Sequence, residues 1–532
     1  MRIIDLVASK ADTLPRSGGA RPLAVPAYDG GDQSVVETGV RRLLIVLGVM
    51  LAALLQTLDS TITNVALPNI QGNLGASIDE GTWVINGYTI AVVIVIPMIP
   101  WLQTTMGRKR YFLICIAGFT AASFACGIST SIEELIAFRV VQGIFGAGLL
   151  ATSQMILRDT FPPEQLGVSQ GIFALGAIMG PALGPPLGGI LVDNANWNWV
   201  FDINVVPGIA SFLLLLAFLR DPTTPRRTRF DFPGLLLLVI GIGSFQYVLS
   251  EGERWDWFSD TNNCIDAAAA AIGISGLIWW ELRTKAPLVD LRAFRYRAVW
   301  GGFILAMLIG GAIFGSTYTL PQVVQNSLDF TATLSGLLIL MRAIPIGVAT
   351  PFIARFVGRV DARIFMAFGF FFMALGNYMQ ATVTTLESNF TTFVLPLMLT
   401  GVGAALLFVP LTTAVLGGVP LNVGAKASAY VNLGTQLGGT IAIAALSTMV
   451  DRRSAFHLAV LAGNVLPGSP AVLQIPGKPN PLQLLGIVQG QATILAYADV
   501  SLAITASSFI AIFLVLLMPK PKKGGPAGGV EM

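Results

Sequence analysis

The sequence has little charge, one histidine and few cysteines. Only 11% of its 532 residues are charged, against about a quarter in typical soluble domains. The 32 basic residues nearly balance the 29 acidic ones, which indicates no polybasic surface for nucleic acid. The single histidine, His457, cannot form a metal cluster, and the three cysteines contain no CxxC pair. We therefore expect no zinc site, no disulfide framework, no cofactor and no nucleic-acid partner.

Long apolar runs are abundant instead. A helix needs about 20 mostly apolar residues to cross a bilayer. Such segments recur fourteen times, near residues 43–66, 82–103, 111–129, 134–157, 168–192, 199–219, 233–250, 263–282, 298–320, 333–356, 364–382, 391–416, 427–450 and 498–518. The sequence therefore predicts an all-α integral membrane protein with fourteen transmembrane helices.

The basic residues are distributed unevenly among the loops. Of the 32 lysines and arginines, the odd-numbered loops contain only Arg254, Arg452, Arg453 and Lys478. Loops that stay in the cytoplasm carry the excess of basic residues. The distribution predicts that both termini are cytoplasmic and that the chain is a multi-pass protein of the cytoplasmic (inner) membrane.

The chain also repeats itself at long range. "PWLQTTMGRKR" places Gly107 and Arg108 seven residues after a proline, and "PFIARFVGRVDAR" does the same with Gly358 and Arg359. Parallel repeats are typical of transporters in which one half rocks against the other around a central site. We predict a flexible cytoplasmic tail, a six-helix bundle, two linker helices, a second six-helix bundle and a cytoplasmic tail, over residues 1–40, 41–220, 221–294, 295–518 and 519–532.

Residues 171–193, GIFALGAIMGPALGPPLGGILVD, form a spanning segment with six glycines and three prolines. Glycines four residues apart lie on one face of a helix and allow another backbone to approach closely. They are compatible with a conformational hinge, but also with static helix packing or a homodimer face. The residues in question are Gly176, Gly180, Pro181, Gly184, Pro185 and Gly188.

Asp59 is the one carboxylate deep in the predicted hydrocarbon region. At 1.5 Å per residue it lies about 24 Å from the face at which the first helix enters. Arg139 lies about 6 Å from the opposite face, and across a core of about 30 Å the two residues reach the same level. An ionisable group inside a membrane is by default a functional candidate. We predict that Asp59 and Arg139 couple transport to protons; a purely structural ion pair is the alternative.

Further candidates could line a substrate cavity. Gln56 and Gln142 lie three residues from Asp59 and Arg139, on matching faces. Arg342 lies near the midplane, where it could contact an anionic substrate or only cap broken backbone near Pro345. Aromatic and methionine side chains form adaptable apolar cavities. The candidates of this kind are Phe145, Phe314, Tyr318, Met341 and Phe408.

Several motifs resemble the drug:proton antiporters of the major facilitator superfamily. The string G-x-x-x-G-P-x-x-G-P-x-x-G-G that starts at Gly176 is similar to their helix-5 motif, and "LDSTITNVALPNI" and "RVVQGIFGAG" are similar to their helix-1 and helix-4 motifs. "EGERWDWFSD", "NLGTQLGGTIAIA" and "QATILAYADV" resemble the fourteen-span EmrB/QacA subfamily, on its EmrB-like side. The resemblance covers residues 41–518. It implies that the fifth helix is a hinge that packs against the other bundle.

One departure from the family concerns the loop after the second helix. The family pattern G-x-L-x-D-R-x-G-R-R appears here without its leading glycine and without its acidic residue. Gly107 and Arg108 are retained, and Gly358 and Arg359 are their counterparts in the second half. A cytoplasmic charge latch through the missing aspartate therefore cannot be carried over to this chain.

The resemblance implies a proton-coupled antiporter that exports amphiphilic small molecules by alternating access. A specific exporter of organic or fatty acids in the same fold is the alternative. An enzyme would need clustered catalytic groups, and a passive channel would need a polar ring; the sequence contains neither, so we expect a transporter that is not an enzyme. The resemblance also implies a periplasmic adaptor and an outer-membrane channel as partners in a host with two membranes, with the loop 451–497 as the candidate contact.

Overall fold

The computed structural model describes residues 36–221, 225, 230–285, 287–357, 359–464 and 481–519. The predicted tails, Gly358 and the middle of the loop 451–497 lie largely outside these residues. Within the described part, fourteen helices are long and apolar enough to cross a membrane. This number and the all-helical class confirm the prediction from the apolar runs.

The first bundle contains six spans. Two of them are interrupted: η2 (Ile96–Met98) joins α2 to α3, and a short break separates α7 from α8. The helices of this bundle are α1 (Gly39–Leu74), α2 (Ile78–Val95), α3 (Ile99–Met106), α4 (Arg108–Gly127), α5 (Ile132–Thr160), α6 (Leu166–Asn194), α7 (Trp199–Asp202) and α8 (Val205–Phe218).

The second bundle also contains six spans, and two helices stand between the bundles in the sequence. The inserted pair is α9 (Phe232–Glu251) and α10 (Thr261–Arg283). The second bundle consists of α11 (Arg297–Ser327), α12 (Ala332–Phe356), α13 (Ala362–Val383), α14 (Phe390–Gly417), α15 (Leu421–Asn464) and α17 (Pro481–Leu514).

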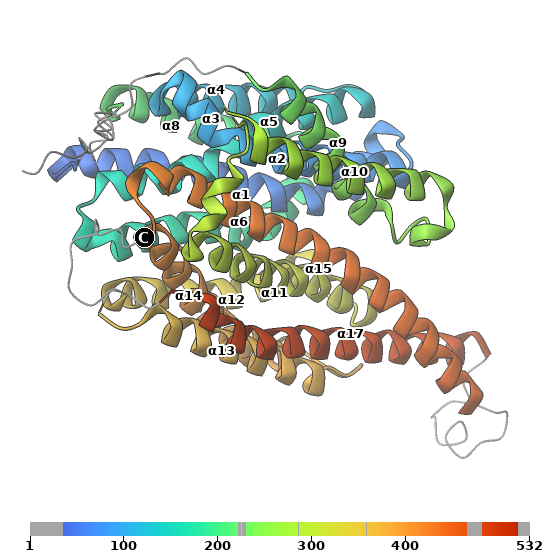
Figure 1. The fold of residues 1–532 in the computed structure, drawn as a ribbon. Coiled ribbons are helices and arrows are strands. Elements are labelled where there is room, and N and C mark those ends of the chain that lie inside the picture. Colours follow the sequence, from blue (N-terminus) through green and yellow to red (C-terminus); the bar gives the residue numbers. More distant parts are fainter. Residues whose placement is uncertain are drawn as a thin grey trace, which may run out of the picture.

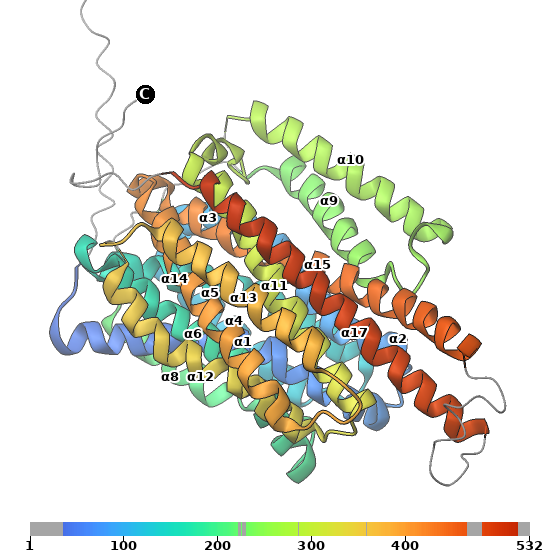
Figure 2. The same ribbon diagram turned by 90° about the horizontal axis from the view of Figure 1, so that it is seen from below.

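The two bundles form two stacked groups of helices that run in roughly the same direction (Figure 1). The inserted pair lies along one flank, as the view from below shows (Figure 2). We call the end at which α1 begins and α17 ends the basic end, because Arg41, Arg108 and Arg363 bond there to Phe218, Asp159 and Met518. The domain limits drawn from the sequence remain a prediction.

Local sequence signals explain where several helices begin. Ser77 and Glu80 form a reciprocal capping box at the start of α2, in which the Glu80 amide donates to Ser77 Oγ over 3.2 Å. Gly107 precedes α4 with φ +85°, a backbone conformation that side chains rarely adopt. Asp260 caps α10 by accepting from the amides of Asn262 and Asn263.

The glycine stripe of α6 faces α1, within the same bundle. A β-carbon at Gly180 would come within 2.5 Å of the Leu58 amide nitrogen, and one at Gly184 would come within 3.0 Å of Thr61 Cβ. Gly188 lies in the same way against Ile62. Two helix backbones can approach this closely only where one of them has no side chains.

The prediction that this helix packs against the other bundle is confirmed, but through residues other than the four glycines of the stripe. The second bundle contacts α6 through different positions: Gly171 lies against Ala354 of α12, and Pro186 lies against Gly336 of the same helix. α6 consequently has small residues on two faces. The glycines four residues apart hold α1, while Gly171 and the proline segment meet α12.

We predict that Gly180→Leu and Gly184→Leu destabilise the first bundle. A side chain at either position overlaps the backbone or side chains of α1, and overpacking typically costs about 1–3 kcal/mol, occasionally more. Thermal unfolding in detergent should show a lower midpoint for both variants, and transport should fall more than substrate binding. Gly347→Ala is the control, because nothing lies within 4 Å of a β-carbon there. Unchanged midpoints in both variants would contradict the tight packing.

Candidate functional site

Asp59 and Arg139 form an ion pair inside the first bundle. Arg139 Nη1 lies 2.5 Å from Asp59 Oδ2, and the two side chains are 1% and 0% exposed. α1 and α5 therefore bring the two residues to the same level, which confirms the pairing predicted from their depths. Their role in proton coupling stays a prediction.

The second oxygen of Asp59 is also bonded. Asp59 Oδ1 accepts from Gln142 Nε2 over 2.9 Å and from Asn204 Nδ2 over 3.0 Å. Both amides also lie within 3.1 Å of Ser123 Oγ, which in turn donates to the Phe201 carbonyl. The carboxylate is thus surrounded by an arginine and two amide donors.

Arg139 is held from several sides. Its Nε donates to the Val84 carbonyl over 3.0 Å, and Nη1 also donates to Gln142 Oε1 over 2.6 Å. The guanidinium lies 4.2 Å from the ring centre of Tyr88 and 5.7 Å from that of Phe201. Cation–π contact of this kind stabilises a desolvated arginine. The geometry of the cluster is therefore fixed by five elements of one bundle.

Three members of the cluster were not predicted from the sequence. Ser123 lies in α4, Tyr88 in α2, and Asn204 in the short break between α7 and α8. One feature of the sequence could have indicated them: all three are polar residues inside apolar segments, and buried polar groups need hydrogen-bond partners. Nothing in the spacing of these residues indicated that they meet Asp59.

The cluster restricts what Asp59 can do chemically. A proton on Asp59 would leave the Arg139 cation without its counter-charge in a region of low dielectric, where an unpaired charge is costly. Proton uptake therefore requires Arg139, Gln142 or Asn204 to move away from the carboxylate. A rearrangement of the helices would provide that movement.

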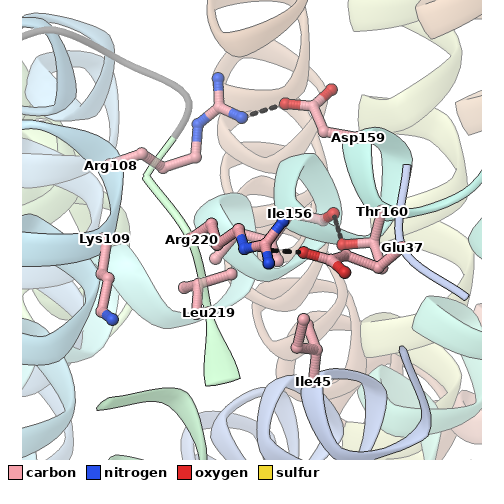
Figure 3. A pocket seen from close by; sticks show the side chains of 9 residues that line it. All are labelled: Glu37, Ile45, Arg108, Lys109, Ile156, Asp159, Thr160, Leu219 and Arg220. Carbon is pink, nitrogen blue, oxygen red and sulfur yellow. Dashed lines mark hydrogen bonds and ion pairs between the residues drawn. The ribbon is translucent and has the colours of Figure 1, made fainter. Parts of the chain in front are cut away.

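The basic end of the first bundle is closed by ion pairs (Figure 3). Arg108 pairs with Asp159 at the end of α5, and Arg220 lies 3.6 Å from Glu37. Asp221 Oδ2 accepts from the Lys109 amide over 3.2 Å at the start of α4. Asp159 and Asp221 thus supply carboxylates near a loop whose own acidic position is missing.

The second copy of the loop motif does not reproduce this arrangement. The side chain of Arg359 is exposed, whereas that of Arg108 is buried. Gly358 lies outside the described residues. The repeat therefore predicts a related backbone segment but not a second buried arginine.

Buried polar side chains join the two bundles in their basic half. Gln154 of α5 accepts a hydrogen bond from Ser428 of α15 and a second one, over 3.3 Å, from Asn432. On its other side Gln154 donates to Gln170 of α6 over 3.2 Å. Arg158 donates to the Leu416 carbonyl of α14 over 2.7 Å. Hydrogen bonds therefore join the two bundles near the basic end.

The predicted cavity residues lie in different surroundings. Gln142 belongs to the Asp59 cluster, and Gln56 accepts from the Leu150 amide over 3.1 Å. The Phe145 ring lies directly against Gly118 of α4. Gln142 and Phe145 therefore face the inside of the first bundle, because their neighbours are α1 and α4. Their role in a substrate cavity stays a prediction.

The remaining candidates lie in the second bundle or at its surface. Phe408 of α14 stacks on Phe173 of α6 at 6.0 Å, across the interface between the bundles. Phe314 lies against Gly439 of α15. Tyr318 is partly buried, and Met341 packs against an apolar cluster around Leu338. The substrate role of these side chains stays a prediction.

Arg342 is a second buried arginine. It is 6% exposed, and its Nη1 donates to Thr317 Oγ1 over 3.0 Å while Nη2 donates to the Ile313 carbonyl over 3.1 Å. Both partners are neutral groups of α11. Among the described residues, no carboxylate forms an ion pair with Arg342, in contrast to Arg139. Within the same described part, no three His, Cys, Asp or Glu side chains lie together as metal ligands would.

We predict that Arg139→Met is strongly destabilising, because it leaves the Asp59 carboxylate buried without a cation. Breaking one partner of a buried pair costs about 3–5 kcal/mol. The double variant Asp59→Asn with Arg139→Met removes both charges and should recover much of the loss in thermal unfolding midpoint. Equal midpoints for the single and double variants would show that the pair carries little electrostatic energy.

Comparison with known proteins supports this arrangement of bundles. The family model of the Major Facilitator Superfamily matches residues 49–443 and, in an overlapping second match, residues 302–521. Multidrug export protein EmrB of Escherichia coli (strain K12) is 37% identical over 507 residues, which cover 92% of this chain and 98% of EmrB. Fatty acid resistance protein FarB of Neisseria gonorrhoeae is 32% identical over 91% of this chain and 97% of FarB.

Solved structures agree on the fold. The proton:xylose symporter XylE aligns with a TM-score of 0.57 and 14% identity, over 90% of this chain and 96% of XylE. An auto-inhibited peptide transporter of the POT family aligns with a TM-score of 0.58 and 14% identity, over 92% of this chain and 99% of that transporter. The chain is a multi-pass membrane protein that belongs to the Major Facilitator Superfamily, on its EmrB-like branch.

Proposed function

We propose that this protein is a proton-coupled antiporter that exports amphiphilic small molecules by alternating access. The observation that carries the proposal is the buried cluster around Asp59, in which a carboxylate, an arginine and two amides can exchange partners. The name of EmrB, a multidrug export protein, supports the same activity. Such an activity needs no catalytic group and no cofactor, because the proton itself is the coupling ion.

The distribution of lysine and arginine supports a basic end that faces the cytoplasm. Both termini would then be cytoplasmic, in the inner membrane. The hydrogen bonds of Gln154 and Arg158 would close the cytoplasmic side in this conformation. These bonds must break when the transporter opens toward the cytoplasm.

The close packing of α6 on α1 provides a mechanical link to Asp59. Gly180 lies against Thr57 and Leu58, the residues directly before Asp59. Thr61 also donates to the Gly180 carbonyl over 3.3 Å. When α6 shifts against α12 of the second bundle, α1 moves with it, and Asp59 moves relative to Arg139 of α5. Loss of the ion pair would then promote protonation of Asp59.

The partners of such an exporter include its substrates and the lipid bilayer. α15 and α17 extend together beyond the other helices at the end opposite the basic end (Figure 1). Asp499 joins the two helices, 2.5 Å from Arg453 Nε and 2.8 Å from His457 Nε2. These two helix ends are the candidate contact for a periplasmic adaptor, through which an outer-membrane channel would be reached. Residues 465–480, in the middle of the loop, lie outside the described residues.

We predict that Asp59→Asn abolishes uphill transport while the protein still inserts. One proton moving down 100 mV supplies about 2.3 kcal/mol, enough for a concentration ratio of about fifty. In inverted vesicles, accumulation should therefore fall toward a ratio of about one, whereas exchange of labelled for unlabelled substrate should continue. Asp193→Asn, at an exposed carboxylate outside the cluster, is the control. Uphill transport with normal pH dependence in Asp59→Asn would refute the assignment.

A specific exporter of organic or fatty acids is the second candidate function, and Arg342 favours it. Asp59 is neutralised by Arg139, whereas Arg342 donates hydrogen bonds to the neutral groups Thr317 and Ile313 of the second bundle. Beside Arg342, a dicationic substrate would find no second carboxylate among the described residues, and unpaired buried charge is costly. FarB is named for resistance to fatty acids, which carry one carboxylate.

We predict that Arg342→Ala weakens transport of anionic amphiphiles and leaves monocationic ones unchanged. A hydrogen bond to a charged group contributes about 1.5–3 kcal/mol, so the KM for the anion should rise by about tenfold to a hundredfold. Uptake into inverted vesicles with matched anionic, monocationic and dicationic compounds measures this, with Arg342→Lys as the variant that retains the charge. Efficient export of the dication, unaffected by Arg342→Ala, would overturn the argument.

A further inference from the structure

The inserted pair of helices connects the two bundles at the end opposite the basic end. α9 is attached to the first bundle: Tyr247 stacks on Trp83 at 5.7 Å, and Glu251 accepts from Asn86 Nδ2 of α2 over 2.9 Å. The turn that follows, residues 252–260, is attached to the second bundle. Trp257 Nε1 donates to Thr448 Oγ1 of α15 over 3.0 Å.

The turn has an unusual backbone at the point of attachment. Asp256 and Trp257 adopt φ values of +47° and +55°, which residues other than glycine rarely do. Such conformations persist where the surroundings hold them in place. Here Trp257 is held by Thr448, and Asp256 lies 3.7 Å from Arg452 of α15. The turn is therefore positioned against α15.

Two carboxyl groups meet at this attachment. Glu253 of the turn lies beside Asp451 and Ser447 of α15, next to the contacts that Trp257 and Asp256 make with the same helix. Two carboxylates repel each other, so a hydrogen bond between two carboxyl groups requires a proton on one of them. The contact between the turn and α15 is therefore complete only when the pair carries one proton.

We propose that Glu253 and Asp451 form a second proton-binding site, in which one shared proton fastens the inserted pair to α15 and so joins the two bundles at this end. Asp59 lies in a different part of the molecule, on α1, and its partners come from the first bundle alone. The second site is partly exposed, in contrast to Asp59. It therefore responds to the pH of the solution that bathes this end.

The electrostatic surroundings agree with a proton held near neutral pH. Partial burial and the neighbouring Asp451 raise the pKa of Glu253 to about 7, whereas the neighbouring Ser447 hydroxyl opposes this. Since the pKa is raised above its ordinary value, the contact is formed below about pH 7 and is lost as the pH rises through that value. Among the described residues, the charged and titratable groups around the pair are Tyr247 and Glu251 of α9, Arg254, Asp256 and Asp260 of the turn, Asp266 of α10, Tyr318 of α11, Arg452 of α15, and Tyr497 of α17.

The chain contains a natural reporter for this contact. Cys264, at the start of α10, is the exposed one of the three cysteines, and its Sγ lies 3.2 Å from the Phe258 carbonyl in the turn. An environment-sensitive fluorophore on Cys264, in purified protein without a membrane gradient, should report one transition between about pH 5 and about pH 9. We expect a midpoint of about 7. This measurement does not depend on transport, so it stands apart from the proposed function.

Two substitutions at Glu253 should act in opposite directions. In Glu253→Gln the amide can donate to Asp451 at any pH, so the signal should stay at its acidic level. In Glu253→Ala the contact is absent, so the signal should stay at its alkaline level. Asp193→Asn and His457→Gln are the controls, and both should keep the transition. His457→Gln removes the one histidine of the chain, so a transition that persists in this variant does not come from histidine.

Infrared difference spectra between acidic and alkaline solution measure the proton directly. The carbonyl band of a protonated carboxyl group should disappear near neutral pH in the unsubstituted protein and be missing from the spectra of Glu253→Gln and Asp451→Asn. This readout also serves if Glu253→Ala fails to fold. A flat fluorescence titration of the unsubstituted protein, a transition that persists in Glu253→Gln, or one that vanishes in His457→Gln would each overturn the proposal.

Discussion

The cost of burying charge is the constraint on which the first bundle depends. Asp59 and Arg139 are removed from water, and the attraction between them offsets that cost only when their remaining hydrogen-bonding groups are satisfied. This requirement explains why groups of α2, of α5 and of the break between α7 and α8 meet the pair at one level. Val84 offers a carbonyl, Gln142 and Asn204 offer amides, and Tyr88 offers an aromatic face. The same saturation means that a proton cannot join the pair unless a partner leaves.

The contact between α1 and α6 connects this cluster to the movement of the bundles. Close approach of two helices in a membrane relies on small residues rather than on hydrophobic burial. The glycines of α6 supply that contact along the part of α1 that carries Asp59, and a separate set of small residues meets α12. One helix therefore contacts both the part of α1 that carries Asp59 and the opposite bundle. This arrangement explains a glycine stripe and a proline pair within one spanning segment.

The two halves have diverged at their ends. Arg108 is buried and paired with Asp159, whereas Arg359 at the corresponding place is exposed. Arg108 and Arg220 form ion pairs within the first bundle, Lys426 of α15 pairs with Asp290, and cross-bundle closure relies on Gln154 and Arg158. At the other end the inserted pair bridges the bundles, with Glu251 bonded to α2 and Trp257 bonded to α15. The extra two helices therefore extend the contact between the bundles.

The sequence by itself determined the fourteen spans, the long-range repeat, and the common depth of Asp59 and Arg139 in the membrane. Hydropathy and the rise of a helix per residue can be read from the order of residues alone, without tertiary information. Only the tertiary structure decided which faces meet. Periodicity shows that the α6 glycines share a face, but the neighbour across that face depends on packing, and it is α1. Asn204 reaches Asp59 from a distant position in the sequence and also bonds to Ser123, and Phe145 turns toward Gly118. Side-chain neighbours of this kind follow from how helices are arranged around one another, which a one-dimensional pattern does not specify.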